Sequence, residues 1–360
     1  MDRLCDINLT LEVLEGCDYH CGGCTVDKDH KPEPVESDEA QRLFALIDDL
    51  QNKGFRPFEF SLAPTDVLSA KNGLAVMSSE LVQGMAERFR SIVLTLALLR
   101  EEGIVELADL ADELMAGKGI RLVVPITVKN SYNEKYLKLL TERVQLFASR
   151  LNKAHLKSVY LTINMFRDNM AAFTPEYHHR IMSLNLGVRT IKDYTFTHSR
   201  NGFENLLRHD EFKHDIYKFT QVIANHDSKF VGHLLHDPFD GFELGYRDGV
   251  LYHIPVIMEK FPIFDPFYEI PKPWDADQVM EYRQNQYFEN LGQFTDHPTC
   301  GDCCHVNVCT HGDLHTTMRY LKIDHCPLGI KNRHDLYREY GKELRYCGTE
   351  LNNLIASKST

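Results

Sequence analysis

Three cysteines lie within eight residues near the start of the chain, and they constrain the fold more than any other feature. Cys17, Cys21 and Cys24 have the spacing C-x3-C-x2-C. Cysteine thiolates are the ligands of iron–sulfur clusters, and so short a loop brings three sulfur atoms to one cluster without supplying a fourth. An open metal position is typical of catalytic sites, because a substrate or cofactor fills it. Gly22 and Gly23 suit such a loop, since glycine lets the backbone wrap closely around a bulky group.

A zinc site is the alternative interpretation of the same cysteines. Tetrahedral zinc normally takes a fourth ligand, which His20 or His30 would supply. The chain has 10 cysteines, gathered towards its two ends, and its N-terminus lacks a secretion-signal pattern. This usage favours metal binding in a reducing compartment over a disulfide framework.

Length and composition set the broad class of the protein. A chain of 360 residues suggests two domains, or one barrel with an appendage, and a hydrophobic share of 43% is ample for a large core. No apolar run reaches the roughly 18 residues of a membrane-spanning helix, so we expect a soluble, cytoplasmic protein without membrane contacts. The net charge of −12 argues against general nucleic-acid binding, which needs surplus Lys and Arg, and leaves a local basic patch open.

Six short segments with the character of strands alternate with segments of helical periodicity. In the first strand, apolar and polar residues alternate from Ile7 to Val13, and the segment runs directly into the cysteine loop. Ser37 is a candidate cap for the first helix. Alternating strands and helices predict a parallel sheet with helical crossovers. The expected strands are 7–13, 58–62, 91–98, 120–128, 159–165 and 188–196, and the expected helices begin near 37, follow 62 as far as 89, and span 101–115, 136–151 and 177–184.

The cysteine spacing after a strand, followed by further strand–helix units, resembles the radical SAM superfamily. The resemblance covers roughly residues 5–225. It implies an α/β fold in which residues 1–230 form a partial (β/α)6 TIM-like barrel. It also implies a [4Fe-4S] cluster on Cys17, Cys21 and Cys24, whose open iron binds the amino and carboxylate groups of S-adenosyl-L-methionine (SAM). The family usually has an aromatic residue just before the third cysteine, where this chain has Gly23.

Polar residues at the predicted carboxyl ends of strands are the candidate SAM contacts, because reacting groups in a parallel barrel come from these ends. Thr65 and Asp66 stand where the family has a Gly-Gly-Glu segment that binds the methionine amino group, and capping of the next turn is their alternative role. The later candidates are Thr127, Lys129 and Asn130 after the fourth strand, Asn164 at the end of the fifth and Tyr194 in the sixth. An ordinary strand-end role is the alternative for each, and no catalytic acid or base is identified, although Tyr19 and His20 are near the cluster by sequence.

A change of sequence character near residue 230 predicts a second domain over residues 231–360. Residues 239–253 predict a β-hairpin that turns at Asp248-Gly249. Further cysteines follow with the spacing Cys300-x2-Cys303-x5-Cys309, and one more lies at Cys326. The hairpin and these cysteines resemble the SPASM extension of radical SAM enzymes, which holds one or two auxiliary four-iron clusters.

The cysteines of this extension imply one auxiliary [4Fe-4S] cluster rather than two. His253-Ile254 and Asp313 stand at positions where the family has the cysteines of the first auxiliary cluster. The expected ligands of the remaining cluster are Cys300, Cys303, Cys309 and Cys326, with Cys347 as an alternative to Cys326 and with Cys304 as a bystander. A structural zinc site is the alternative, for which His305, His311 and His325 add ligands.

The family resemblance implies a specific chemistry. The reduced cluster cleaves SAM to methionine and a 5′-deoxyadenosyl radical, which takes a hydrogen atom from the substrate. We expect the substrate to be a ribosomally made peptide that is crosslinked or oxidised; a dehydrogenase or epimerase acting on a small molecule, and a non-enzymatic zinc or iron–sulfur module, are the alternatives. Flavodoxin or ferredoxin is the expected reductant, and because such carriers are acidic, docking requires a positive patch such as Lys28 and Lys31.

Overall fold

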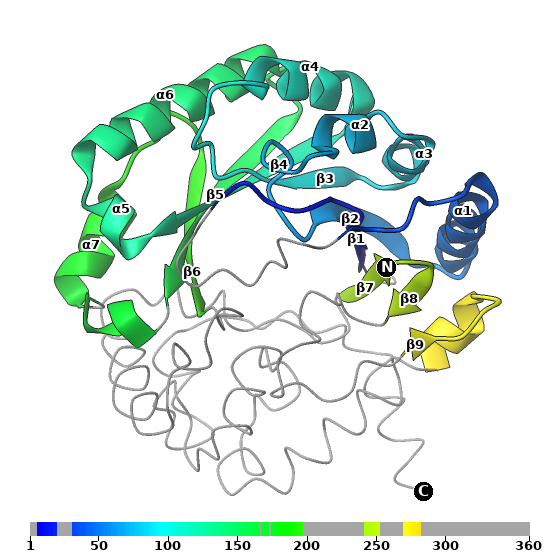
Figure 1. Ribbon diagram of the computed structural model, residues 1–360. Helices are drawn as coiled ribbons and strands as arrows, with labels where there is room; N and C mark the ends of the chain where they lie inside the picture. The colour runs from blue at the N-terminus through cyan, green and yellow to red at the C-terminus, as the bar shows by residue number, and fades with distance from the viewer. Residues whose placement is uncertain are drawn as a thin grey trace, which may run out of the picture.

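Figure 1 shows the computed structural model of the chain. It describes residues 6–19, 31–165, 167–172, 174–196, 241–252 and 269–281. These segments form one curved sheet with helices along its convex side. None of the helices in these segments is long and apolar enough to cross a membrane.

The sheet is parallel over its first six strands, as the sequence predicts. Its strand order is β6-β5-β4-β3-β2-β1-β7-β8-β9, so consecutive strands from β1 to β6 lie side by side. All carboxyl ends of these six strands therefore share one edge of the sheet. The strands are β1 (Asp6–Glu12), β2 (Arg56–Ala63), β3 (Ser91–Thr95), β4 (Gly119–Thr127), β5 (Leu156–Met165), β6 (Thr190–Phe196), β7 (Gly241–Arg247), β8 (Val250–Tyr252) and β9 (Glu269–Ile270).

A helix or helix pair connects each parallel strand to the next and covers the convex side of the sheet (Figure 1). Such crossovers are the usual way to join parallel strands. The helices are α1 (Ser37–Asn52), α2 (Gly73–Met77), α3 (Glu80–Arg88), α4 (Ile104–Leu114), α5 (Val128–Ser131), α6 (Glu134–Arg150) and α7 (Pro175–Ser183), with a 3-10 turn η1 (Arg167–Ala172).

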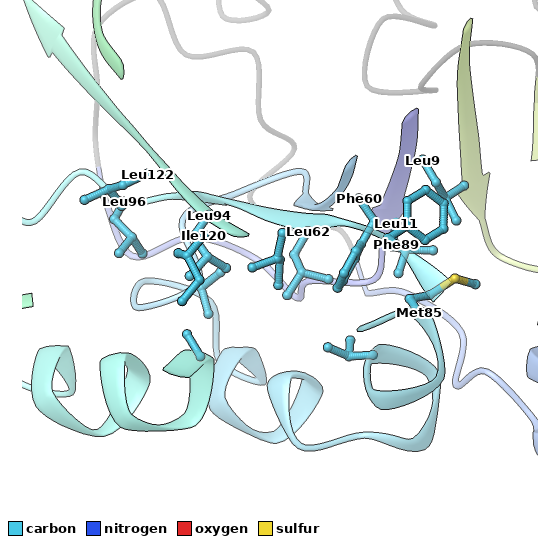
Figure 2. Close-up of a cluster of buried hydrophobic side chains, with 14 of the residues drawn as sticks. Leu9, Leu11, Phe60, Leu62, Met85, Phe89, Leu94, Leu96, Ile120 and Leu122 are labelled. Carbon is cyan, nitrogen blue, oxygen red and sulfur yellow. The ribbon is translucent and has the colours of Figure 1, made fainter. Parts of the chain in front are cut away.

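The hydrophobic core lies between the sheet and these helices. Alternation in β1 sends Ile7, Leu9 and Leu11 to the helical side, where each is at most 1% exposed. Figure 2 shows Leu9 and Leu11 in a cluster with apolar residues of β2, β3 and β4 and with residues from the α3 region. Each Å² of apolar surface that is buried stabilises a fold by about 25 cal/mol, so this layer is the main source of stability. The cluster also fixes which strand faces look inward.

The concave face of the sheet is polar. On β1 and β2, the Thr10 and Ser61 hydroxyl oxygens lie 3.0 Å apart. Nearer the amino ends of the strands, Arg121 Nε lies 2.6 Å from a Glu59 carboxylate oxygen. Polar groups on the inner face of an open barrel leave it suited to a polar ligand.

The predicted hairpin is confirmed, and it extends the barrel sheet. β7 and β8 are antiparallel and turn at Asp248 and Gly249, whose φ angles of 49° and 78° are those of a tight hairpin turn. β7 pairs in parallel with β1 on the edge opposite β2. The first strand of the barrel thus has a neighbour on both sides, which sequence patterning did not indicate.

Three local features differ from the sequence predictions. The Ser37 hydroxyl donates to a Glu80 carboxylate oxygen at 3.2 Å, across to α3, and makes no cap bond in α1. The segment up to residue 89 contains two helices, because α2 ends at Met77 before α3 begins. β3 ends at Thr95 instead of continuing to Leu98, whose φ of 52° is incompatible with a strand.

Candidate functional site

The cysteine loop leaves the carboxyl end of β1 and is held against the segment that follows β2. The Leu14 N–H donates to the Ala63 carbonyl at 2.9 Å. Asn72 makes two bonds to the loop: its Oδ1 accepts from the Glu15 N–H at 2.7 Å, and its Nδ2 donates to the Val13 carbonyl at 2.9 Å. Side chains that bond main-chain groups in this way fix a loop that lacks strand pairing. The loop therefore reaches the site in a defined conformation.

The Cys17 thiol lies at the carboxyl edge of the sheet and is partly buried. Its Sγ lies 3.3 Å from the Ser69 Oγ and accepts a hydrogen bond from the Tyr19 N–H at 3.4 Å. Gly16, just before it, has a φ of 62°, a left-handed conformation that glycine adopts without strain. A free thiol whose sulfur accepts from a main-chain N–H and contacts a hydroxyl fits a cluster ligand, since polar neighbours of this kind stabilise a thiolate. Cys21 and Cys24, with His20 and His30, lie outside the described segments.

Asp66 is buried beside this thiol and organises the turn after β2. Its Oδ1 accepts from the N–H groups of Leu68 and Ser69 at 2.7 and 3.3 Å, and its Oδ2 accepts from the Ala97 N–H at 2.5 Å. The turn therefore joins the carboxyl ends of β2 and β3. Burial raises the pKa of Asp66 from 3.8 to about 6, against the lowering effect of these main-chain bonds. The capping role is the one that these contacts show for Asp66.

Ser69 connects the two predicted parts of the site. Its hydroxyl lies 3.2 Å from the Thr65 Oγ1 and donates to the Asp66 carbonyl at 3.0 Å, while it also contacts the Cys17 sulfur. Thr65 and Asp66 thus each contact Ser69, which in turn contacts Cys17. Sequence reasoning missed Ser69 and Asn72, because a Ser or Asn in a loop carries no signal of its own until the fold places it.

Tyr19 packs on the same side, between the cysteine loop and the segment after β3. It is 8% exposed, and the Arg100 guanidinium carbon lies 5.4 Å from its ring centroid. Arg100 also lies 3.3 Å from an Asp18 carboxylate oxygen. Burial, with a further contribution from the charge of Asp66, raises the pKa of Tyr19 to about 12. The phenol is therefore protonated at neutral pH.

The predicted contacts on β4 and β5 lie further along the same edge. Thr127 and Asn164 are partners in the register of these two strands. The Thr127 Oγ1 caps α5 by accepting from the Asn130 N–H at 3.1 Å, while Lys129 is exposed. The Asn164 carbonyl accepts from the Asn169 side chain at 3.0 Å. The backbone of Tyr194 belongs to β6, and its side chain lies outside the described part of the chain.

Two further charged residues meet on the concave face near the cysteine loop. Glu12 ends β1 and is 1% exposed, and its carboxylate lies 3.8 Å from the Arg247 Nη1 on β7. A charged residue is rarely this buried without a partner of opposite charge. A glutamate at an otherwise apolar strand end is unusual, so the sequence marks Glu12 as a residue of interest. Nothing in the sequence around Arg247 indicated that it pairs with Glu12.

The predicted second metal site cannot be placed, since Cys300, Cys303, Cys309 and Cys326 all lie beyond the described residues, as do Cys304, Cys347, His253 and Asp313. The same holds for Lys28, while Lys31 of the predicted basic patch is exposed.

Comparison with solved structures finds a likeness in fold. The structure of polyhistidine-tagged anSMEcpe with bound AdoMet matches with a TM-score of 0.54 and 11% sequence identity, over 98% of this chain and 95% of that one. Native anSMEcpe with bound AdoMet and the Cp18Cys peptide matches with a TM-score of 0.53 and 11% identity, over 98% and 99% of the two chains. The likeness confirms the expected α/β partial-barrel fold. No family model matches this chain, and no curated protein matches its sequence.

Proposed function

We propose that this chain is a radical SAM enzyme. The observation that carries the proposal is the position of Cys17: the first thiol of the C-x3-C-x2-C motif lies at the carboxyl end of the first strand of a parallel partial barrel, with hydrogen-bond partners around its sulfur. The fold shared with AdoMet-bound anSMEcpe supports the same conclusion. Catalytic groups of parallel barrels lie at this edge.

The cofactors would occupy this edge of the sheet. Cys17, Cys21 and Cys24 would hold a [4Fe-4S] cluster, and Thr65 with Asp66 would lie next to the methionine amino group of SAM. Thr127, Lys129 and Asn164 are the candidates for the ribose and carboxylate groups. Once bound, the cluster and SAM supply a 5′-deoxyadenosyl radical that removes a hydrogen atom from the substrate.

The protein's own residues hold this arrangement and control its surroundings. Asp66 fixes the turn between β2 and β3, so it sets where Thr65 and Ser69 stand relative to the sulfur. Tyr19 keeps its proton and shields the cysteine loop from solvent on one side. The buried carboxylate of Glu12, next to Arg247, places paired charges at the mouth of the barrel that would orient a polar substrate.

A ribosomally made peptide is the substrate class that we propose, and the reaction would be crosslinking or oxidation. The complex of anSMEcpe with the Cp18Cys peptide supports this, because that enzyme shares the fold. β7 and the strands beyond it widen the sheet edge beside the site and give an extended peptide a surface to lie along. A small-molecule dehydrogenase or epimerase remains the alternative that substrate screening would reveal.

We further propose that residues 231–360 form a SPASM-like domain with one auxiliary [4Fe-4S] cluster on Cys300, Cys303, Cys309 and Cys326. The confirmed turn at Asp248-Gly249 supports its first element. The reductant would be a flavodoxin or ferredoxin; such carriers are acidic, and the exposed Lys31 would be one of their contacts. A cytoplasmic location stays a prediction.

Iron analysis and electron paramagnetic resonance of protein purified without oxygen test these assignments. We expect about eight irons per chain for two four-iron clusters, and a change in the spectrum of the reduced first cluster on adding SAM. Cys17→Ala should lose that SAM-sensitive signal and keep the other cluster, while Cys304→Ala is the matched control that keeps both. About four irons would exclude the auxiliary cluster, a zinc content would support the alternative metal, and a spectrum insensitive to SAM would reject the enzyme assignment.

A further inference from the structure

A cavity lies at the end of the barrel opposite the cysteine loop, where the strands begin. It has a volume of about 490 Å³ and is lined by the starts of β2, β4 and β5 and by the segment between α3 and β3. β2 alone separates this end from the carboxyl edge by eight residues, or about 25 Å. The basal cavity, as we call it, is therefore distinct from the site around Cys17.

The basal cavity concentrates positive charge in an acidic protein. Its lining includes Arg56, Arg88, Arg90, Lys118 and Lys157 and no Asp or Glu. Five of its eleven lining residues are thus cationic, whereas the chain has 40 Lys and Arg among 360 residues and a net charge of −12. The grouping is far denser than the composition would produce by chance.

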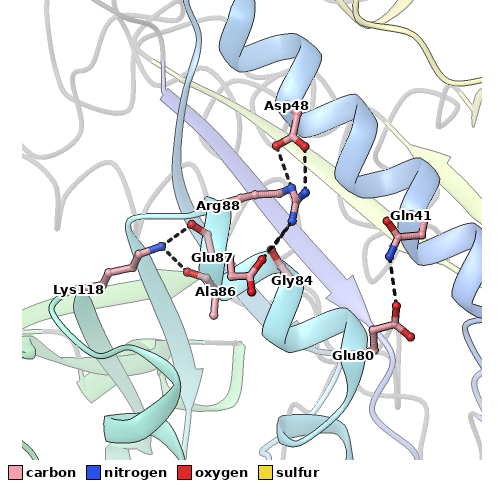
Figure 3. A network of polar contacts seen from close by, with 8 residues as sticks. All are labelled: Gln41, Asp48, Glu80, Gly84, Ala86, Glu87, Arg88 and Lys118. Carbon is pink, nitrogen blue, oxygen red and sulfur yellow. Dashed lines mark hydrogen bonds and ion pairs between the residues drawn. The ribbon is translucent and has the colours of Figure 1, made fainter.

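Two of these cations are neutralised by neighbouring carboxylates. Arg88 binds both carboxylate oxygens of Asp48, at 2.8 and 2.9 Å, as Figure 3 shows. Arg56 pairs with Asp6, its register partner on the neighbouring strand. These ion pairs hold two guanidinium groups in fixed orientations, so they form a rigid part of the wall.

The other three cations keep their charge available to a ligand. The Lys118 ammonium donates to the Glu87 carbonyl at 2.6 Å and to the Ala86 carbonyl (Figure 3), which leaves one of its three donors. Burial lowers the pKa of Lys118 because it disfavours the charged form of the ammonium group. A bound anion would stabilise that charged form. The Lys157 ammonium donates to the Ala154 carbonyl at 2.6 Å, which leaves two of its three donors. Within the described segments, neither Arg90 nor Lys157 forms an ion pair with a carboxylate.

The backbone presents these side chains firmly. The Arg90 N–H donates to the Pro57 carbonyl at 3.2 Å, and its carbonyl accepts from the Gly119 N–H at 3.0 Å. A Cβ at Gly119 would lie 3.1 Å from the Lys157 Cγ, so the absence of a side chain there lets the lysine stem lie across the floor. The partly buried Phe55 adds an apolar wall beside the cations.

We propose that the basal cavity binds a phosphate ester of a small organic molecule. The cavity has five positively charged side chains, and three carboxylates lie beside them, those of Asp6, Asp48 and the exposed Glu87. The excess is about two positive charges, which matches a phosphate dianion. Arginine and lysine donors together are the usual ligands of phosphate oxygens. The volume exceeds what inorganic phosphate needs and accommodates an organic group against Phe55. This site is independent of the proposed SAM chemistry.

Isothermal titration of the anaerobically purified 360-residue chain with inorganic phosphate and with pyrophosphate tests the proposal. We expect saturable binding, tighter for pyrophosphate and weakened by salt, and no binding of acetate at equal ionic strength. Arg90→Gln and Lys157→Gln should each weaken it about tenfold, because each removes a charge-assisted hydrogen bond. Both side chains are exposed, so the variants should keep the wild-type melting temperature.

Lys138→Gln is the matched control, because Lys138 is an exposed lysine on α6 outside the cavity. It should leave phosphate binding unchanged. Equal binding by all four proteins, equal binding of acetate, or no binding at all would overturn the proposal. The result does not depend on SAM cleavage, which can be measured separately on the same variants.

Discussion

Replacing Asp66 with Asn tests the electrostatics of the turn that holds the site. Burial raises the pKa of Asp66 from 3.8 to about 6, so the folded protein binds this proton more tightly than the unfolded chain does. The contribution of Asp66 to stability is therefore fully present below pH 3.8 and is lost as the pH rises towards 6. The whole shift corresponds to about 3 kcal/mol, of which about 2 kcal/mol falls between pH 4 and pH 7.

Urea unfolding of cluster-free protein across this pH range measures the effect. The unfolding free energy of wild type minus that of Asp66→Asn should fall by about 2 kcal/mol from pH 4 to pH 7. Loss of one acceptor for the buried N–H groups adds an offset of about 1–3 kcal/mol that does not change with pH. A difference that is flat with pH would refute the reasoning.

Asp109→Asn is the control for this slope. Asp109 is exposed and forms a 2.7 Å ion pair with Arg150, whose hydrogen bonds lower its pKa. The stability that Asp109 contributes should therefore increase as the pH rises, which is opposite in sign to the effect of Asp66. The increase should be small because the ion pair is open to solvent.

Three further substitutions test the packing and the site. Gly84→Ala places a Cβ within 2.1 Å of the buried Phe44 ring, so a net loss of about 1–2 kcal/mol is expected in thermal unfolding despite the better helix propensity of Ala; a gain in stability would contradict the observed packing. His155→Phe removes both the Nε2 acceptor of the Gly117 N–H at 2.9 Å and the Nδ1 partner of Asp112 at 2.6 Å, and should cost about 2–3 kcal/mol; no loss of stability would contradict these two contacts. Ser69→Ala removes a hydroxyl that lies 3.3 Å from the Cys17 sulfur and should shift the potential of the first cluster in a redox titration; an unchanged potential would argue against that contact.

The alternation of strand-like and helical segments was sufficient to predict the parallel sheet, and the family resemblance implied the partial barrel. β1, β4 and β5 lie within three residues of their predicted starts, because each has a strong period of two on a face that packs against helices. The end of β3 was predicted too late, since Leu96 and Leu98 are apolar and buried yet follow the end of the strand. Apolar residues indicate burial, whereas the end of the strand is seen in the bond from the Ala97 N–H to Asp66 and in the φ of Leu98.

The partner of the hairpin and much of the site were not predictable from local sequence. β7 pairs with β1 across more than two hundred residues, and no periodicity encodes which edge a hairpin joins. The cysteine spacing indicated Cys17 directly, because metal ligands follow fixed patterns. The contacts that position it come from Ser69 and Asn72, whose roles depend on the folded path of the chain.

The formation of 5′-deoxyadenosine tests the central claim most directly. Anaerobically reconstituted protein, reduced with dithionite and supplied with SAM, should produce 5′-deoxyadenosine and methionine in equal amounts, detected by mass spectrometry. Cys17→Ala should abolish the product, whereas Lys138→Gln should retain it. Product at the wild-type level from Cys17→Ala, or no product from wild-type protein whose cluster is intact and reduced, even with candidate peptides and small-molecule substrates added, would contradict the assignment of a radical SAM enzyme.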